Sequence, residues 1–257
     1  MTMEQIKTAK SKSKGLSSNA LKLIAIAAMT VDHITWAVFP GTQRVWYVIA
    51  LHIIGRLTAP IMWFFIAEGC KKTHSIKKYA LRMLIFAAVS HFAYCFAFGI
   101  PLSLTHGGFF NRTSVMWALT LAVVLTGINQ SVNVKEWQKT AAMFGFCVLA
   151  FPADWSSIAV MAPFFIYLHY GERKKQMADI VIWTFVYALV YFLFLDRVYG
   201  VLQMFTFLSI PLLTLYNGER GKSKGMKWLF YVYYPAHLVA VGLIRLALHG
   251  NIPAIFQ

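Results

Sequence analysis

Residues 21–40, LKLIAIAAMTVDHITWAVFP, form an apolar run long enough to cross a lipid bilayer, with Asp32 and His33 in its second half. Ionisable side chains at that depth are costly unless they face a protein interior or a water-filled cavity, so the pair indicates a functional site. Ten residues separate Lys22 from His33, which is about 16 Å along a helix. A cation near one surface and a potential base near the midplane suit a ligand that reaches inward from the aqueous phase.

The composition excludes a soluble globular domain. Of the 257 residues, 59% are hydrophobic and 13% are charged, and the mean hydropathy is +0.60. The net charge of +15 comes from lysines and arginines between apolar runs, so we interpret it as a topology signal that also attracts an anionic ligand, and we expect no nucleic-acid partner. The three cysteines lie in or beside apolar runs without metal-ligand spacing, which is typical of packed thiols.

We predict an all-α, polytopic bundle of about nine transmembrane helices in the cell (inner) membrane. Residues 1–20 are expected to form a basic cytoplasmic tail, and residues 21–257 a single transmembrane domain. The predicted spans are 21–39, 45–70, 79–100, 114–131, 138–152, 155–170, 178–195, 198–216 and 226–248. The fifth and sixth spans are short and joined by the tight FPADW connection, so a re-entrant hairpin is an alternative for that pair.

Charge placement predicts a cytoplasmic amino terminus and a carboxyl terminus outside. The loops assigned to the inner side carry Lys7, Lys10, Lys12, Lys14, Lys71, Lys72, Lys77, Lys78, Lys135, Lys139, Arg173, Lys174, Lys175, Arg220, Lys222, Lys224 and Lys227. The outer side carries Arg44, Arg112 and Arg197. We find no internal repeat, which disfavours an inverted-repeat transporter.

Several ionisable residues within the spans are expected at one depth, roughly 16–21 Å from the inner surface. These residues are His33, Arg56, His91 and His237. By the same measure, Glu68 and Arg82 are expected near the cytoplasmic edge and Asp154 near the outer edge.

Three kinds of chemistry are open to such a layer. A neutral histidine can act as a general base, the group can relay protons for transport, or histidines can bind a metal, although they supply too few ligands at helical spacing here. Asp32 and His33 are adjacent and point about 100° apart, so we expect the group that orients His33 to come from another span. Arg56 can pair with Asp32 to neutralise two buried charges, and such a pair is compatible with catalysis.

Five stretches carry a resemblance: LKLIAIAAMTVDHI, HIIGRLTAPIMWFFIAEG, KKYALRMLIFAAVSH, LLTLYNGERG and FYVYYPAHL. In this order, between Leu21 and His237, they resemble the TraX family of integral membrane proteins, whose best-known member acetylates the amino terminus of conjugative pilin. The family is similar to a wider group of transmembrane acyltransferases, in which a basic residue, ten others and a histidine mark the active site. Lys22 and His33 match that spacing.

The resemblance implies acetyl-CoA as the donor, entering from the cytoplasm, with His33 beside the acceptor nucleophile. It implies a catalytic set of His33, Asp32 and Arg56. The implied donor-binding set is Lys22, Lys78, Arg82 and Glu68, and the implied acceptor-binding set is His237, His91, Asp154 and Tyr234. The simpler structural interpretations are snorkelling for Lys22, an interfacial ion pair for Glu68 with Lys71 or Lys72, a helix cap for Asp154, and satisfied bundle histidines for His52, His91 and His237.

The sequence therefore predicts a membrane-embedded acetyltransferase that acts on an amine or hydroxyl of a membrane or extracytoplasmic acceptor, such as a pilin, a peptide or a glycan. Direct transfer and an acetyl-histidine intermediate both remain open. The main alternative is a proton- or ion-coupled transporter that uses the buried His/Asp/Arg layer. A non-catalytic membrane chaperone for a small pilin or peptide is a third hypothesis.

Overall fold

The computed structural model describes residues 15–102, 112–221 and 225–254, so most of the predicted basic tail lies outside the described residues. The described chain is helical apart from isolated bridges and connecting loops, which confirms the predicted all-α class. The elements are α2 (Ser18–Val38), α3 (Trp46–Gly55), α4 (Thr58–Lys72), α5 (Ile76–Phe98), α6 (Val115–Asn129), α7 (Glu136–Ala150), α8 (Ile158–Leu168), α9 (Arg173–Phe194), α10 (Arg197–Gln203), η1 (Met204–Leu208), α11 (Ser209–Thr214) and α12 (Met226–His249).

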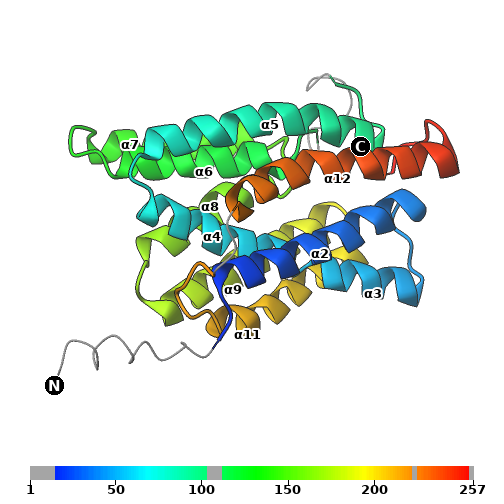
Figure 1. Cartoon of the computed structure of the whole chain (residues 1–257), viewed down its shortest axis with the longest axis horizontal. Coiled ribbons are helices and arrows are strands. Elements are labelled where there is room, and N and C mark those ends of the chain that lie inside the picture. Colours follow the sequence, from blue (N-terminus) through cyan, green and yellow to red (C-terminus); the bar gives the residue numbers. More distant parts are fainter. Residues whose placement is uncertain (1–14, 103–111, 222–224, 255–257) are drawn as a thin grey trace.

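Three long helices form one side of the bundle. α12 packs against both α5 and α2, and the three run along the long axis of the molecule (Figure 1). Gly242 lets α12 approach α5 closely, because a Cβ atom at this position would lie 2.5 Å from Cε1 of Phe96. Small residues allow such close helix packing in membranes, where the hydrophobic effect does not drive helices together.

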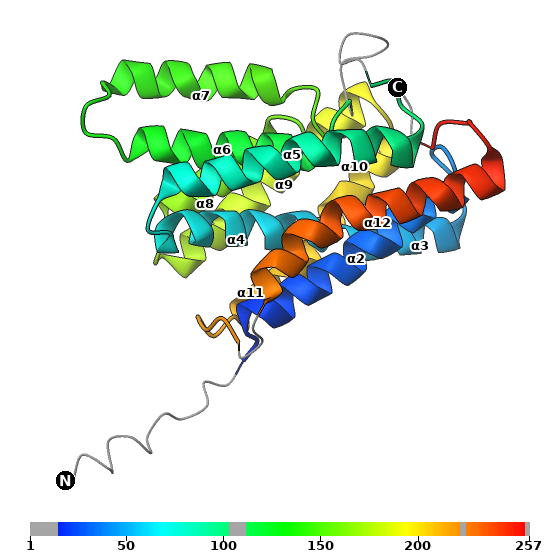
Figure 2. The same cartoon turned by 45° about the horizontal axis from the view of Figure 1, so that its top comes forward.

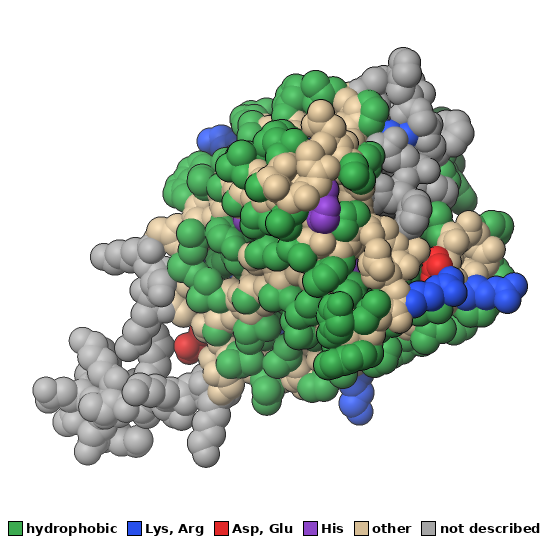
Figure 3. Space-filling model, turned by 90° about the vertical axis from the view of Figure 1, so that its right-hand side faces the viewer, with side chains coloured by type: hydrophobic (Ala, Val, Ile, Leu, Met, Phe, Trp, Pro, Cys, Tyr) green, Lys and Arg blue, Asp and Glu red, His purple; other side chains and the backbone are tan. Residues whose placement is uncertain are grey.

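The remaining helices enclose the other side. α4, α6, α8 and α9 pack in sequence, whereas α7 lies on the periphery against α6 and α8 (Figure 2). Large apolar side chains of α7, including Phe144 and Val148, are exposed. The face seen in Figure 3 is likewise mainly hydrophobic, as expected for side chains that contact lipid.

Six helical segments are long and apolar enough to cross a membrane, among the described residues, which identifies a multi-pass membrane protein. They are Ser18–Val38, Trp46–Lys72, Ile76–Phe98, Arg173–Phe194, Arg197–Thr214 and Trp228–His249. The other three predicted spans correspond to α6, α7 and α8, which have 15, 15 and 11 residues. At 1.5 Å per residue these are about 16–22 Å long, which is less than the roughly 30 Å hydrocarbon core.

Two of the long segments are interrupted. The segment predicted as 45–70 breaks between α3 and α4 at Arg56, and the segment predicted as 198–216 consists of α10, η1 and α11. Pro60 lies in the first turn of α4, where its missing N–H is tolerated. Both interruptions lie beside the interior cavity described below, since Arg56 and Gln203 line it.

The loop between α7 and α8 also reaches this cavity. The amide of Asp154 donates to the carbonyl of Thr113 at 2.9 Å, and Trp155 and Ser156 adopt left-handed backbone conformations with φ of 62° and 46°. Asp154 lines the same cavity as Arg56, whereas the sequence placed it near the outer edge of a full-length span. The reason is that α6 and α8 are short and begin beside the cavity, where irregular backbone is tolerated because it is covered by protein.

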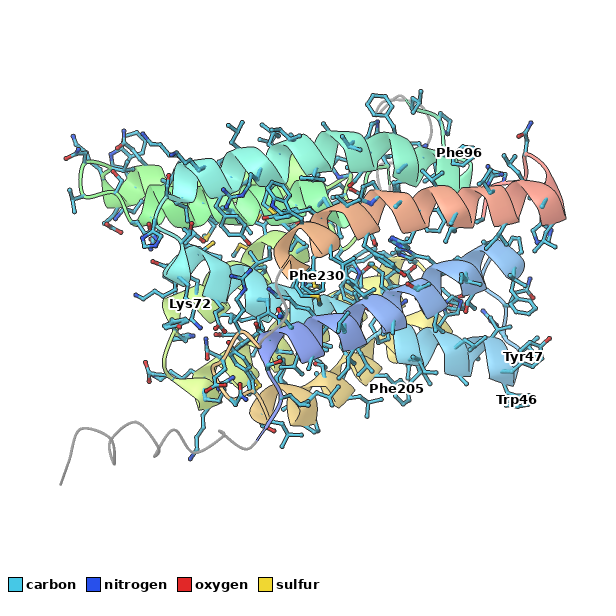
Figure 4. All side chains as sticks on the ribbon, in the orientation of Figure 1. Trp46, Tyr47, Lys72, Phe96, Phe205 and Phe230 are labelled. Carbon is cyan, nitrogen blue, oxygen red and sulfur yellow. The ribbon has the colours of Figure 1, made fainter. Side chains whose placement is uncertain are left out.

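The basic connections gather at one end of the molecule. The α4–α5, α6–α7 and α8–α9 loops lie together at the left of Figure 1, and Trp46 and Tyr47 lie at the opposite end in Figure 4. Lys72 marks the basic end. This arrangement agrees with the grouping of loops that the charge pattern predicts.

Candidate active site in the bundle interior

An interior cavity of about 130 Å³ lies between α2, α4, α6, α9 and α12. Its walls include Asp32, His33, Arg56, Asp154 and Tyr234. Five of the residues predicted from sequence therefore converge on one space, although they come from four separate parts of the chain.

Asp32 is held by two partners from the next helical segment. One terminal nitrogen of Arg56 donates to both carboxylate oxygens of Asp32, at 2.7 and 2.8 Å. Nδ1 of His52 lies 2.8 Å from Oδ1 of the same carboxylate. The predicted Asp32–Arg56 pair is present, and it is buried and hydrogen-bonded, as paired charges away from water must be.

Arg56 is fixed on its remaining sides. Its Nε donates to the carbonyl of His52 at 3.1 Å, and Nη1 donates to Oε1 of Gln203 at 2.9 Å. A guanidinium has five N–H groups, and Nη1, which carries two of them, has one acceptor among the described residues. One N–H on Nη1 is therefore left to meet a ligand in the cavity that Arg56 lines.

The backbone of α3 comes very close to Asp32. A Cβ atom built on Gly55 would lie 2.5 Å from Cγ of Asp32, which is closer than real side chains approach. Gly55 therefore permits the contact between α2 and α3 that positions the ion pair.

His33 is oriented by α12 and not by Asp32. Its Nδ1 lies 2.8 Å from Nε2 of His237, and Nδ1 of His237 lies 3.1 Å from the carbonyl oxygen of Tyr233. A carbonyl can only accept, so Nδ1 of His237 carries a proton, and in the neutral ring Nε2 accepts from Nδ1–H of His33. With the protons placed in this way, Nε2 of His33 carries no hydrogen and its lone pair is available. This atom has no hydrogen-bond partner within the described part of the chain.

Aromatic rings form the wall opposite α2. The ring of Trp155 stacks on Tyr187 with centroids 4.5 Å apart and meets Trp63 edge-on at 5.3 Å. The guanidinium carbon of Arg56 lies 5.7 Å from the centroid of Trp155. These contacts fix the irregular 151–157 loop, and the left-handed conformation of Trp155 at the cavity is the kind of strained backbone that is retained at functional sites.

A second, larger cavity of about 360 Å³ lies toward the basic end. Four cationic side chains line it: Lys22, Lys72, Arg82 and Arg220. Glu68 also lines it, and its carboxylate accepts from Lys72 Nζ and, at 2.5 Å, from the hydroxyl of Tyr216.

Two buried donors in this second cavity have no partner among the residues the structure describes. They are Nδ2 of Asn19 and Nε of Arg82. A buried donor without an acceptor costs about 1–3 kcal/mol. The cavity therefore presents positive charge and unmet hydrogen-bond donors, which suits an anionic ligand.

Three predicted residues, Lys78, His91 and His237, do not line either cavity, although His237 contacts His33 as described above. Lys78 is exposed. The two ring nitrogens of His91 lie 3.1 Å from Oγ1 of Thr113 and 3.1 Å from the carbonyl of Leu102, which matches the interpretation of a satisfied bundle histidine.

With this geometry established, the chain can be compared with known proteins. A family model described as TraX protein matches residues 17–245. The chain belongs to the TraX family. A probable fimbrial assembly protein, FimC of serogroup H1 from Dichelobacter nodosus, is 28% identical over 233 residues, which is 86% of this chain and 93% of that protein. No solved structure matches the chain.

Membership in the TraX family confirms the resemblance read from the sequence, but that reading assigned no site role to four residues beside the cavities. His52 and Gln203 complete the Asp32–Arg56 network, Trp155 covers it, and Asn19 lines the cationic cavity. The spacing carried a signal for His52, because it lies four residues before Arg56 and therefore on the same helical face. Nothing local marks Gln203, which is 147 residues away from Arg56.

Proposed function

We propose that this TraX-family protein is a membrane-embedded acyltransferase that moves an acetyl group from acetyl-CoA, on the cytoplasmic side, to an amine or hydroxyl of an acceptor in the membrane or outside it. One observation carries the proposal. The cavity that holds an unpartnered histidine nitrogen adjoins a larger cavity lined by cations, and the two share wall residues.

The cationic cavity suits the charged half of coenzyme A. Phosphate groups accept from lysine and arginine in charge-assisted hydrogen bonds, and Arg82 Nε and Asn19 Nδ2 are buried donors that need an acceptor. Glu68 acts indirectly in this scheme, because it holds Lys72 at the rim and Tyr216 on the wall. Lys78 is not part of this donor site, since it is exposed and outside the cavity lining.

His33 is the proposed general base. Its Nε2 removes a proton from the acceptor amine or hydroxyl, and the acceptor atom attacks the thioester carbonyl. The tetrahedral intermediate collapses with cleavage of the C–S bond, and the proton on His33 passes to the departing thiolate to give coenzyme A. His237 is a positioning residue, because its hydrogen bond fixes the tautomer of His33.

Arg56 is proposed to stabilise the oxyanion. Its position is fixed by Asp32, the His52 carbonyl and Gln203, and the residue lines the cavity. A donor held in place before the reaction costs no reorganisation when charge develops on the carbonyl oxygen. Asp154, Tyr234 and the aromatic wall are the candidates for acceptor contacts, since they line the same cavity.

The printed name of the Dichelobacter relative, a probable fimbrial assembly protein, supports a pilin or a related envelope peptide as the acceptor. In this scheme the N-terminal amine of such a subunit enters the cavity from the membrane. A glycan hydroxyl is the alternative that the same chemistry allows.

The test is transfer of labelled acetyl from acetyl-CoA by protein reconstituted in proteoliposomes with envelope extract as the acceptor source. We expect His33→Gln to abolish transfer, whereas His74→Gln, at an exposed histidine outside both cavities, leaves it unchanged. Mass spectrometry of the labelled species identifies the acceptor. Transfer that persists in His33→Gln would refute the assignment of the base.

The same preparation separates the rival functions. A transporter predicts that His33→Gln stops ion flux across the vesicle and that the protein transfers no acetyl group. A chaperone predicts that coenzyme A gives no thermal stabilisation and that a peptide copurifies with the protein.

A further inference from the structure

The two cavities meet at a boundary formed by apolar side chains. The cavities share four wall residues among those described: Met62 from α4, Met116 and Leu119 from α6, and Phe230 from α12. The inner cavity is the smaller of the two, at about 130 Å³ against about 360 Å³. We call this shared wall the neck.

The neck has a fixed side and an adjustable side. Leu119 and Met116 are 2% and 7% exposed and are held by the core, whereas Met62 and Phe230 are only partly buried. Phe230 lies near the start of α12, toward the interior of the bundle and far from Trp46 at the opposite end (Figure 4). Nζ of Lys22 lies 5.4 Å from the centroid of the Phe230 ring, a cation–π distance that holds the ring at the boundary of the cationic cavity.

An apolar neck admits the uncharged part of a ligand and excludes its charged part. A phosphate cannot enter it, because the neck offers no donor or cation and an unpaired charge is very costly in such surroundings. The uncharged end of an acyl thioester can enter. The ligand is then oriented with its phosphates among the cations and its acyl group toward His33.

We propose that Phe230, together with Met62, Met116 and Leu119, is the determinant of acyl-chain size in this protein and restricts the donor to short acyl groups. The proposal rests on the proposed function, in that it takes an acyl-CoA as the donor. Size discrimination follows because the Phe230 ring, which contacts Lys22 at the boundary of a small cavity, must move when the acyl group grows, or the chain must stay outside.

Binding to detergent-purified protein tests this without knowledge of the acceptor. Dissociation constants are measured for coenzyme A, acetyl-CoA and butyryl-CoA. We expect the wild type to bind butyryl-CoA no more tightly than acetyl-CoA. In Phe230→Ala we expect butyryl-CoA to bind about tenfold or more tighter than acetyl-CoA, because two additional CH₂ groups are then buried in apolar surroundings.

The matched control is Phe205→Ala, which truncates a phenylalanine that is 40% exposed and lines neither cavity. Its butyryl-to-acetyl ratio should equal that of the wild type. If Phe230→Ala does not fold, Phe230→Leu and Met62→Ala are measured in its place, and either should shift the ratio in the same direction.

An unchanged ratio in every folded neck variant that still binds coenzyme A would overturn the neck as the size determinant while leaving the proposed function intact. A wild type that binds neither coenzyme A nor either acyl-CoA would overturn the proposed function itself, and the neck proposal with it. A general weakening of all three ligands with a constant ratio would likewise refute a role in selectivity.

Discussion

Gly55 is the position where one methyl group should disrupt the whole charged network. Gly55→Ala places a Cβ atom 2.5 Å from Cγ of Asp32, so either α3 or Asp32 must move. Asp32 cannot yield freely, since Arg56 and His52 both hold its carboxylate. Breaking a buried ion pair costs about 3–5 kcal/mol. Alanine is more favourable than glycine in a helix by about 1 kcal/mol, so the net destabilisation is about 2–4 kcal/mol.

Gly145→Ala is the matched control for this substitution. Gly145 lies in α7, and a Cβ atom there meets nothing within 4 Å. Thermal unfolding in detergent should show a clear drop for Gly55→Ala and no drop, or a slight gain, for Gly145→Ala. The rate of acetyl transfer should fall in Gly55→Ala and stay unchanged in Gly145→Ala. Equal stability and activity in the two variants would show that the close approach of α3 to Asp32 does not position the ion pair.

Three further predictions concern separate parts of the structure. His237→Ala removes the acceptor of His33 Nδ1–H, so the transfer rate should fall by up to about 100-fold with little change in the KM for acetyl-CoA, and His237→Gln should recover part of the loss; an unaltered rate would contradict the tautomer argument. Arg82→Met should weaken coenzyme A binding by about tenfold or more in calorimetry, whereas Lys78→Met should not; equal effects would argue against the cationic cavity as the donor site. Arg245→Met should lower the unfolding temperature without altering the rate of the folded fraction, because Arg245 donates to four backbone carbonyls near the end of α5 and the chain terminus; unchanged unfolding would refute this capping role.

Much of the outline could be predicted from the sequence because its physical signals are local. A run of apolar residues must form a helix in lipid, so the boundaries of α2, α5 and α12 lie within a few residues of the prediction. A charge inside such a run must be paired, so the sequence offers Arg56 as a partner for Asp32, and the two side chains are in contact. The depth argument placed His33 and His237 at one level, and they are in fact hydrogen-bonded.

The rest depends on contacts that the sequence does not encode locally. Equal depth says nothing about the direction of a side chain, and His91 faces Thr113 and Leu102 while His237 faces His33. The length of an apolar run in the sequence does not reveal where a helix begins or is interrupted. The sequence therefore predicts membrane spans at α6 and α8, although these helices are short.

The interruptions and the buried charges are two aspects of one arrangement. A helix that stops inside a bundle leaves carbonyl groups without intrahelical partners, and these must be satisfied within the protein because lipid offers no donors. Arg56 stands at the break between α3 and α4, where it donates back to the carbonyl of His52 and across to Gln203 at the end of α10. The same guanidinium neutralises Asp32 on α2. The planar fork of an arginine makes all these contacts at once, which the compact ammonium group of a lysine cannot do. The guanidinium that joins the ends of these helices is thus also part of the cavity wall.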